Sequence, residues 1–346
     1  MRNFYGIFYL LLIGILAFSG CDSDDEVVPQ AATLSSKGVF ILHEGNFLSG
    51  NASIDFFSPA DSSLEADLFK RANNQLLGDV LQSMTLHGAF AYLVVNNSGV
   101  IEVVDTASFT SSATITGLQS PRYMVPVSDS KAYVSDLFAN QVHIVDLLTN
   151  QKTGSIPLPG WTEKMALHQN EVWVTNSRKP FVYVIDPATD QLADSVAIDS
   201  SANSLQVDNT GNLWVLCAGE AARNQNARLF QIDPAQRQVV QALTPSSTGF
   251  GAGELQLTAG GDKLCFLMNG VWEYDLAQSF FSNGPVIPEN GKNFYGLGVD
   301  PVTDERYVAD ALDFVQRGRI EVYQADGTLV RDFLSGGIIP GEFVFR

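Results

Sequence analysis

The feature that most constrains this chain is a unit that recurs seven times. Each copy is an apolar strand with an aromatic residue, then a polar turn, then a second strand that usually ends on Asp. Two clear copies are KAYVSDLFANQVHIVDLLTNQKTGSI from Lys131 and EVWVTNSRKPFVYVIDPATDQLADSV from Glu171. Aligning the first strands superposes one anchor position in every copy, which is occupied by Phe40, Tyr92, Tyr133, Trp173, Trp214, Cys265 and Tyr307.

The spacing of these anchors predicts the fold. Successive anchors are 52, 41, 40, 41, 51 and 42 residues apart, near the ~40 to 45 residues of a four-stranded propeller blade. The second strands align independently at the position of Ser58, Asp105, Asp146, Asp186, Asp233, Asp275 and Gln324. Because both alignments agree in register, the sequence predicts an all-β fold, a seven-bladed β-propeller of four-stranded blades with few helices.

The two ends of the repeat predict how the ring closes. The first copy, GVFILHEGNF from Gly38, has no inner strand before it, whereas IIPGEFVF from Ile338 to Phe345 is a strand without a blade. Pairing the two would remove both exposed sheet edges, which otherwise promote aggregation. We therefore expect residues 37–346 to form one propeller domain, closed by the C-terminal strand joining the first blade.

The N-terminus precedes the repeat and has a different character. Residues 1–20 combine Arg2 with an apolar run that suits a secretory signal but is short for a membrane span. The sequence FSGC resembles a bacterial lipobox and predicts lipidation at Cys21; the alternative is an ordinary cleaved signal. Residues 21–36 are predicted to form an acidic, flexible tether. The acidic residues indicate either a signal for export to the outer face of the outer membrane or a solvated linker on its periplasmic face.

Net charge narrows the possible partners. The chain has 20 Lys and Arg against 38 Asp and Glu, a net charge of −18. Removing residues 1–20 would take away Arg2 alone and leave −19. Such a surface repels phosphate backbones and anionic lipid heads, so we expect no nucleic-acid partner and a lipid, rather than charge, as the membrane anchor.

One face of a propeller collects residues from distant parts of the chain, because the loops entering the inner strands and those joining the second and third strands surround the channel there. Aromatic rings interleaved with Asn and Arg on this face suit a broad, polar-edged ligand. The alternatives are that Trp161 and Phe294 plug the channel and that the Asn residues belong to turns. The predicted ligand-binding residues are His43, Glu44, Asn46, Phe47, Asn96, Arg122, Tyr123, Asp136, Phe138, Trp161, Lys164, Asn176, Arg178, Asn203, Phe250, Asn293, Phe294, Tyr295, Asp310, Asp313 and Phe314.

Catalytic and metal motifs are not evident. The four His residues are not spaced as zinc ligands, and GFGAGE from Gly249 lacks the Lys of a phosphate loop. No G-x-S-x-G elbow occurs, although carboxylates on the predicted face leave an acid and base pair open. We expect a non-enzymatic protein without cofactor or metal. Cys217 and Cys265 are expected to be buried free thiols, although a disulfide would be permitted in an oxidising compartment.

Two resemblances extend this interpretation. The copies AYVSDLFANQVHIVDLLT and VWVTNSRKPFVYVIDPAT resemble the YVTN family of β-propeller repeats, with Trp173 to Asn176 matching the name motif except at the aromatic. This resemblance covers most of residues 80–330 and implies a fold rather than a function.

The second resemblance is narrower. FILHEGNFLSGNASIDFF, YVADALDFVQRGRIEVYQADG and the terminal GGIIPGEFVF together resemble a family of surface lipoprotein propellers long labelled a domain of unknown function. Some of its members capture cobalamin and deliver it to a TonB-dependent outer-membrane transporter. The resemblance implies a corrinoid ligand and such a transporter as partner, with Glu44, Asn46 and Phe47 at the rim. His43 departs from the family, which often has Asn there.

Overall fold

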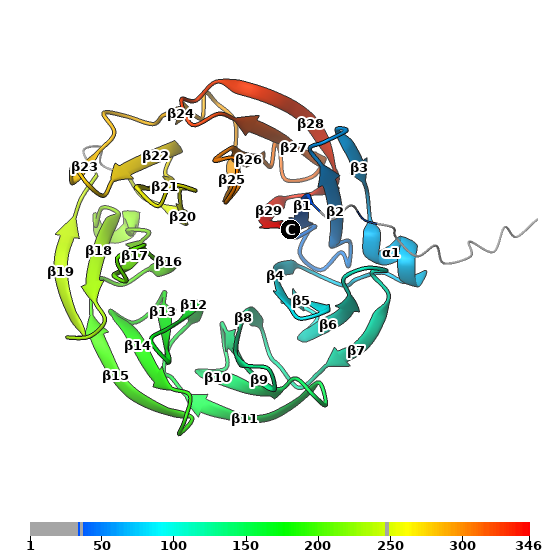
Figure 1. The fold of residues 1–346 in the computed structure, drawn as a ribbon, viewed down its shortest axis with the longest axis horizontal. Helices are drawn as coiled ribbons and strands as arrows, with labels where there is room; N and C mark the ends of the chain where they lie inside the picture. The colour runs from blue at the N-terminus through cyan, green and yellow to red at the C-terminus, as the bar shows by residue number, and fades with distance from the viewer. Residues whose placement is uncertain (1–33, 35–36, 246–248) are drawn as a thin grey trace, which may run out of the picture.

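The computed structural model describes residue 34 and residues 37–245 and 249–346. The described chain forms a ring of seven antiparallel sheets around a central channel (Figure 1). The predicted signal, lipidation site and tether lie outside the described residues, apart from residue 34. No helix in the described part is long and apolar enough to cross a membrane.

Each sheet is one blade, with its innermost strand at the channel. The innermost strands are β29 (Pro340–Phe345), β4 (Leu81–His87), β8 (Pro121–Ser128), β12 (Thr162–His168), β16 (Ala202–Val207), β20 (Gly253–Leu257) and β25 (Phe294–Val299). In this order they belong to blades 1 to 7. The second strands are β1 (Val39–His43), β5 (Phe90–Val95), β9 (Lys131–Asp136), β13 (Glu171–Asn176), β17 (Leu213–Cys217), β21 (Lys263–Leu267) and β26 (Arg306–Asp310).

The outer half of each blade follows the same order. The third strands are β2 (Ser53–Ser58), β6 (Val100–Asp105), β10 (Gln141–Asp146), β14 (Phe181–Asp186), β18 (Arg228–Asp233), β22 (Gly270–Asp275) and β27 (Arg317–Tyr323). The outermost strands are β3 (Ser63–Glu65), β7 (Ser111–Ile115), β11 (Gln151–Pro157), β15 (Gln191–Ala197), β19 (Gln238–Leu243), β23 (Phe280–Phe281) and β28 (Leu329–Ile338). Blade 6 has an additional piece, β24 (Ile287–Pro288), paired with β22. The described helices are α1 (Leu68–Asn73) and the 3₁₀ turn η1 (Ala221–Arg223).

The predicted repeat is confirmed. Every anchor lies on a second strand, and all seven are buried. The second alignment also matches the structure, since each aspartate in it ends a third strand. Asp105, Asp186 and Asp233, for example, accept backbone N–H groups from the following turn. Turn aspartates of this kind hydrogen-bond to their own backbone two residues on.

The ring closes as predicted. Strand β29 pairs antiparallel with β1, and Val39 lies opposite Phe345. Gly38 and Arg346 exchange backbone hydrogen bonds of 3.3 and 2.9 Å at the end of this ladder. Figure 1 shows the C-terminus beside β1 at the channel. The first and last strands of the ring, β1 and β29, are therefore paired in blade 1.

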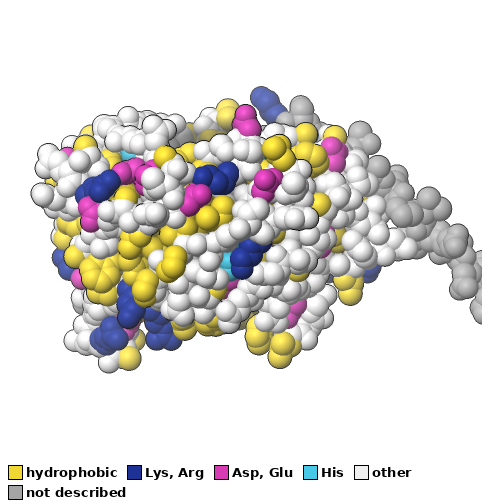
Figure 2. All heavy atoms as spheres, turned by 90° about the horizontal axis from the view of Figure 1, so that it is seen from below, with side chains coloured by type: hydrophobic (Ala, Val, Ile, Leu, Met, Phe, Trp, Pro, Cys, Tyr) yellow, Lys and Arg dark blue, Asp and Glu magenta, His cyan; other side chains and the backbone are white. Residues whose placement is uncertain are grey.

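Hydrophobic clusters fill the spaces between neighbouring blades. One contains Val39 and Phe343 of blade 1 together with Tyr307 of blade 7. Cys217 and Cys265 are buried and unpaired, which confirms the expected free thiols. Burial raises the pKa of Cys265 to about 12, so this thiol stays protonated. Seen edge-on, the ring carries acidic and basic side chains scattered among hydrophobic ones (Figure 2).

Candidate ligand-binding site

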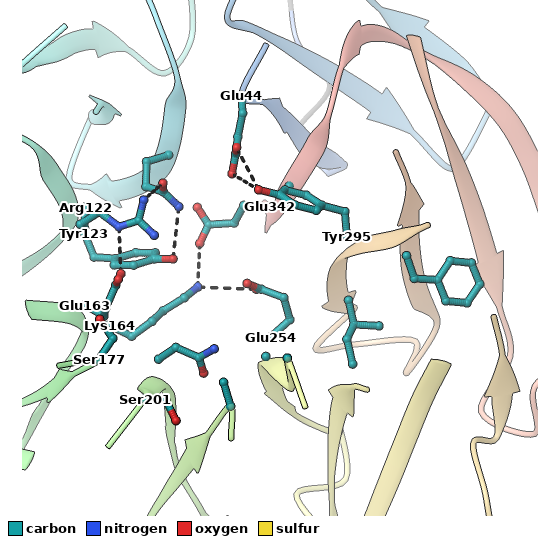
Figure 3. A pocket seen from close by; sticks show the side chains of 18 residues that line it. Glu44, Arg122, Tyr123, Glu163, Lys164, Ser177, Ser201, Glu254, Tyr295 and Glu342 are labelled. Atoms are coloured by element: carbon teal, nitrogen blue, oxygen red, sulfur yellow. Dashed lines mark hydrogen bonds and ion pairs between the residues drawn. The ribbon is translucent and has the colours of Figure 1, made fainter. Parts of the chain in front are cut away.

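A cavity of about 440 Å³ opens at one end of the channel, where the innermost strands begin. We call this end the channel mouth. Every blade contributes to the wall through its innermost strand. The lining residues are Glu44, Gln82, Arg122, Tyr123, Glu163, Lys164, Ser177, Ser201, Asn203, Ala218, Gly251, Gly253, Glu254, Leu267, Phe294, Tyr295, Gly341 and Glu342 (Figure 3).

A β-bulge in each innermost strand explains why neighbouring residues share this wall. Side chains alternate between the two faces of a regular strand. A bulge sets two residues opposite one and redirects a side chain. Consecutive residues such as Glu163 and Lys164 therefore both reach the cavity. The register shifts fall at Leu81/Ser83, Pro121/Met124, Thr162/Met165, Ala202/Ser204, Gly253/Gln256, Phe294/Gly296 and, between β1 and β29, Leu42/His43.

Lys164 of blade 4 crosses the cavity to side chains of blades 1, 6 and 3. Its Nζ lies 3.1 Å from a Glu342 oxygen and 3.9 Å from a Glu254 oxygen. It also lies 4.5 Å from the centre of the Tyr123 ring, a cation–π distance. Burial opposes the charge on Lys164, but Tyr123, Glu342 and Glu254 together raise its pKa above the ordinary value. The ammonium therefore stays charged, and Figure 3 shows both carboxylates turned toward it.

Arg122 forms a second polar cluster on the same wall. Its Nε donates to Glu163 Oε2 at 2.8 Å, and its Nη1 donates to Gln82 Oε1. Gln82 in turn donates to Tyr123 Oη at 3.4 Å. The Arg122 guanidinium, whose planar fork can satisfy several acceptors at once, therefore holds Glu163 and Gln82, and Gln82 extends the cluster to Tyr123.

Two carboxylates in the cavity have raised pKa values. Burial raises the pKa of Glu44 above 4.5, although Tyr295 donates to both of its oxygens at 3.1 and 3.0 Å. Burial likewise raises the pKa of Glu254, with Lys164 opposing the shift. Four carboxylates share the cavity with two cations. The site is thus rich in hydrogen-bond acceptors and suits a ligand that offers donors.

The structure brings seven of the predicted residues into the wall of the cavity. These are Glu44, Arg122, Tyr123, Lys164, Asn203, Phe294 and Tyr295. Asn203 Nδ2 donates to the Ala252 carbonyl at 2.9 Å, and its Oδ1 has no hydrogen-bond partner among the described residues. Neither Trp161 nor Phe294 plugs the channel in the described structure, since the cavity lies open beside Phe294 and Trp161 is not part of its wall.

A second group of predicted residues stabilises the loops around the mouth. Asp136, Asn176 and Asp310 end their second strands, and each accepts two or more backbone N–H groups of adjacent loops. Asp313 does the same in an exposed turn. These oxygens are occupied by turn hydrogen bonds, which is the alternative role expected of strand-end Asn and Asp.

Four more predicted residues also bond within the protein. His43 is fully buried, with Nδ1 3.3 Å from Ser53 Oγ. Burial lowers its pKa despite the neighbouring Asp55 carboxylate. The side-chain amides of the others donate to neighbouring loops: Asn46 to the Phe314 carbonyl, Asn96 to Ser120 and Pro121, and Asn293 to the Leu312 carbonyl.

The remaining predicted residues are aromatic rings and one Arg around the mouth. Phe138 meets Trp161 edge to face at 5.4 Å, and the Arg178 guanidinium lies 3.7 Å from the Trp161 ring centre. Phe314 meets Tyr295 edge to face at 5.8 Å. Phe47 and Phe250 are exposed at the same end. These residues border the mouth without lining the cavity.

The sequence interpretation missed Gln82, Glu163, Glu254 and Glu342. Each belongs to an innermost strand and lies at or next to the register shift of that strand. The predicted residues include two neighbours on blades 3 and 7 but only Lys164 of the pair on blade 4, because the position of a bulge is not evident from the residue order. The available signal was a charged pair inside an otherwise apolar strand, as in Glu163-Lys164.

Among the described residues no three His, Cys, Asp or Glu side chains are grouped so as to hold a metal ion. The side chains that line the cavity offer charges, hydrogen-bond donors and hydrogen-bond acceptors to a ligand.

Comparison with known proteins places the chain. A family model described as a domain of unknown function, DUF5074, matches residues 37–345. The chain belongs to this family. The match covers strands of every blade, and its description agrees with the expected family of unknown function. No curated protein matches the chain.

Solved structures similar to this DUF5074 ring share its fold at low identity. A quinonprotein alcohol dehydrogenase-like protein from Bacteroides thetaiotaomicron has a TM-score of 0.69 and 15% identity, covering 90% of this chain and 78% of its own. A putative 6-phosphogluconolactonase from Bacteroides fragilis has a TM-score of 0.67 and 10% identity, and the match covers 91% of this chain and 99% of that one. Kuenenia stuttgartiensis hydrazine synthase has a TM-score of 0.66 and 16% identity, and the match covers 75% of this chain and 87% of that one. These similarities show the fold alone.

Proposed function

We propose that this protein is a lipid-anchored, cell-surface binding protein that captures a small nutrient, cobalamin or another corrinoid, for a TonB-dependent outer-membrane transporter. The observation that carries the proposal is the acceptor-rich cavity built by all seven innermost strands and bordered by exposed rings at the channel mouth. Binding pockets of this kind combine apolar contact with a few placed polar groups.

The proposed ligand matches these two parts of the site. A corrinoid is a broad macrocycle ringed by amides, and amide groups donate hydrogen bonds to carboxylates and carbonyls. Glu44 and Glu254 offer such acceptors inside the cavity. The macrocycle would lie across the mouth against rings such as Phe138 and Trp161, which provide contact area at low entropic cost.

Titration of the purified protein with cyanocobalamin tests the ligand, followed by calorimetry and by the visible spectrum. We expect one saturable site per chain. Phe138→Ala and Trp161→Ala should each weaken binding about tenfold, equivalent to about 1.4 kcal/mol. Phe90→Ala is the matched control, because Phe90 is 39% exposed against 49% for Phe138 and lies at the opposite end of its blade. Silence at high micromolar ligand would exclude cobalamin.

A second candidate function is a scaffold that docks a membrane protein without a small ligand. It is favoured by five exposed apolar side chains on loops at the mouth of blades 7, 1 and 2: Phe47, Leu48, Leu76, Phe314 and Val315. Hydrogen bonds from Asn46 to the Phe314 carbonyl and from the Leu48 N–H to Asp79 tie these loops together. Capture of a transporter with equal affinity in the presence and absence of cyanocobalamin would favour this function.

Membrane attachment is tested separately. Cys21→Ser should abolish palmitate labelling and release the protein from membranes, and a mutant that stays bound would contradict the lipobox interpretation. Protease added to intact cells then distinguishes the cell surface from the periplasmic face.

A further inference from the structure

A second cavity, of about 300 Å³, lies between blades 7 and 1 at the end of the ring opposite the mouth. We call it the seam cavity. Strand β29 runs from Pro340 at the mouth to Phe345 at this end, so the two cavities are separate. The wall of the seam cavity is mostly apolar, with charges at its border. Its residues are Lys37, Gly38, Val39, Pro59, Ala60, Asp300, Pro301, Val302, Thr303, Glu305, Tyr307, Phe345 and Arg346.

One wall residue has an unsatisfied polar group. Tyr307 is 0% exposed, and its ring meets Phe345 edge to face at 5.4 Å. Its hydroxyl has no hydrogen-bond partner among the described residues. A buried hydroxyl without a partner costs folding free energy, and most such groups in native proteins are paired. Tyr307 therefore offers an unused donor to the seam cavity.

The equivalent position of blade 3 shows one way in which this hydroxyl can be satisfied. Tyr133 is the anchor there, and its Oη donates to Asp190 in the β14–β15 turn of the next blade. Lys131 Nζ joins them, 2.7 Å from Asp190 Oδ1 and 2.6 Å from the Pro187 carbonyl. Hydrogen bonds across blades 3 and 4 thus satisfy the anchor hydroxyl there, although a surface pocket of about 550 Å³ also lies beside this turn.

Two residues of the repeat differ between the two places. The β2–β3 turn of blade 1 begins Pro59-Ala60, as the β14–β15 turn begins Pro187-Ala188. Ser62 stands where that turn has Asp190, and both have left-handed backbone, with φ of 59° and 56°. The serine side chain is shorter by one heavy-atom bond, and the Tyr307 hydroxyl has no acceptor among the described residues. Glu305, which replaces Lys131, lies 3.2 Å from Arg331 instead.

We propose that the seam cavity is a second binding site, for a small, uncharged, largely apolar molecule of one or two rings whose carbonyl or ether oxygen accepts a hydrogen bond from Tyr307. The volume suits this size, because a cavity of about 150 Å³ holds one benzene ring. The wall includes two acidic side chains, Asp300 and Glu305, and two basic ones, Lys37 and Arg346, so these side chains carry no net formal charge, which agrees with an uncharged ligand. This site is independent of the mouth and of the function proposed for it.

The state of the phenol agrees with a donor role. Burial raises the pKa of Tyr307, and the Glu305 and Asp300 carboxylates raise it further. The hydroxyl therefore keeps its proton at neutral pH and can donate a hydrogen bond to a ligand oxygen.

The test uses 6-propionyl-2-dimethylaminonaphthalene, a two-ring ketone whose fluorescence shifts to the blue in apolar surroundings. The purified protein should bind it at one saturable site. Tyr307→Phe removes only the hydroxyl and should weaken binding about five- to tenfold. Ser62→Asp should supply the acceptor that blade 4 has, weaken binding similarly and raise the melting temperature. Val315→Asp changes an exposed apolar residue at the mouth and is the control for non-specific binding.

Circular dichroism and thermal unfolding establish that each variant is folded. Loss of affinity in Tyr307→Phe and Ser62→Asp, with native affinity in Val315→Asp, supports the proposal. Absence of saturable binding to the folded native protein overturns it, as does native affinity in both seam variants. Because Ser62 lies on a turn, its variant remains informative even if Tyr307→Phe fails to fold.

Discussion

Ring closure makes a quantitative prediction for Phe343→Ala. Phe343 lies on β29, is 8% exposed and packs 5.8 Å from the Tyr307 ring across the closing seam. A buried aromatic removes about 150–250 Å² from water, which at ~25 cal/mol per Å² corresponds to about 4–6 kcal/mol. The methyl group that remains and partial relaxation reduce this to about 3–4 kcal/mol, within the range measured for Phe to Ala in cores.

Thermal unfolding measures this loss. An unfolding entropy of ~2.1 cal/mol/K per residue over roughly 310 residues gives about 0.65 kcal/mol/K. Phe343→Ala should therefore lower the melting temperature by about 5 °C. Phe280→Ala is the matched control, because Phe280 is 51% exposed on the outer strand β23 and should change the melting temperature by less than about 1 °C. Equal shifts in the two variants would refute the assignment of β29 as the closing strand.

Three further outcomes are expected. Burial raises the pKa of Glu254, so the folded state binds this proton more tightly than the unfolded state does. The contribution of this group to the free energy of unfolding therefore falls as pH rises above about 4.5. In urea unfolding, Glu254→Gln should gain stability relative to the native protein from pH 4.5 to 7, and a constant difference between the two would contradict the shift. Asp136→Ala removes the acceptor of four backbone N–H groups and the 2.9 Å contact with His143, and should cost about 3 kcal/mol or more. Asp313→Ala, in an exposed turn, should leave the urea midpoint nearly unchanged. Lys164→Met leaves Glu342 and Glu254 without their cation and should lower stability by about 3 kcal/mol, whereas Lys152→Met, on an exposed outer strand, should not change the melting temperature measurably.

The fold was predictable because each blade repeats the same local code. An aromatic such as Trp173 on the second strand packs between blades, and a turn Asp such as Asp186 ends the third strand. Both signals recur at nearly constant spacing, so seven weak signals add up to one strong one. The unpaired strands at the two ends of the chain then require closure, because a ring without it would leave two exposed edges.

The site was only partly predictable. The sequence predicted the correct face of the propeller, but which side chains point into the cavity depends on the bulges in the innermost strands. Arg122 and Lys164 were assigned to the mouth, and both line the cavity. Glu254 and Glu342 were missed, since a bulge alters which neighbours face the channel and leaves no separate mark in the residue order. Asp136 and Asn176 were included among the predicted ligand-binding residues because the sequence does not distinguish an Asp or Asn that binds a ligand from one that stabilises a turn at the end of a strand.

The sequence by itself determined the number of blades, the identity of the second strand in each and the strand that closes the ring, because these follow from a repeated pattern of local residues. Only the tertiary structure decided which side chains meet. Lys164 contacts Glu342, which lies 178 residues later in the chain, because the ring brings blades 4 and 1 to one channel. The Tyr307 hydroxyl has no partner among the described residues, and the turn of blade 1 beside it has Ser62 where the matching turn of blade 4 has Asp190. Contacts between blades depend on which blade follows which around the circle, and a local repeat cannot specify them.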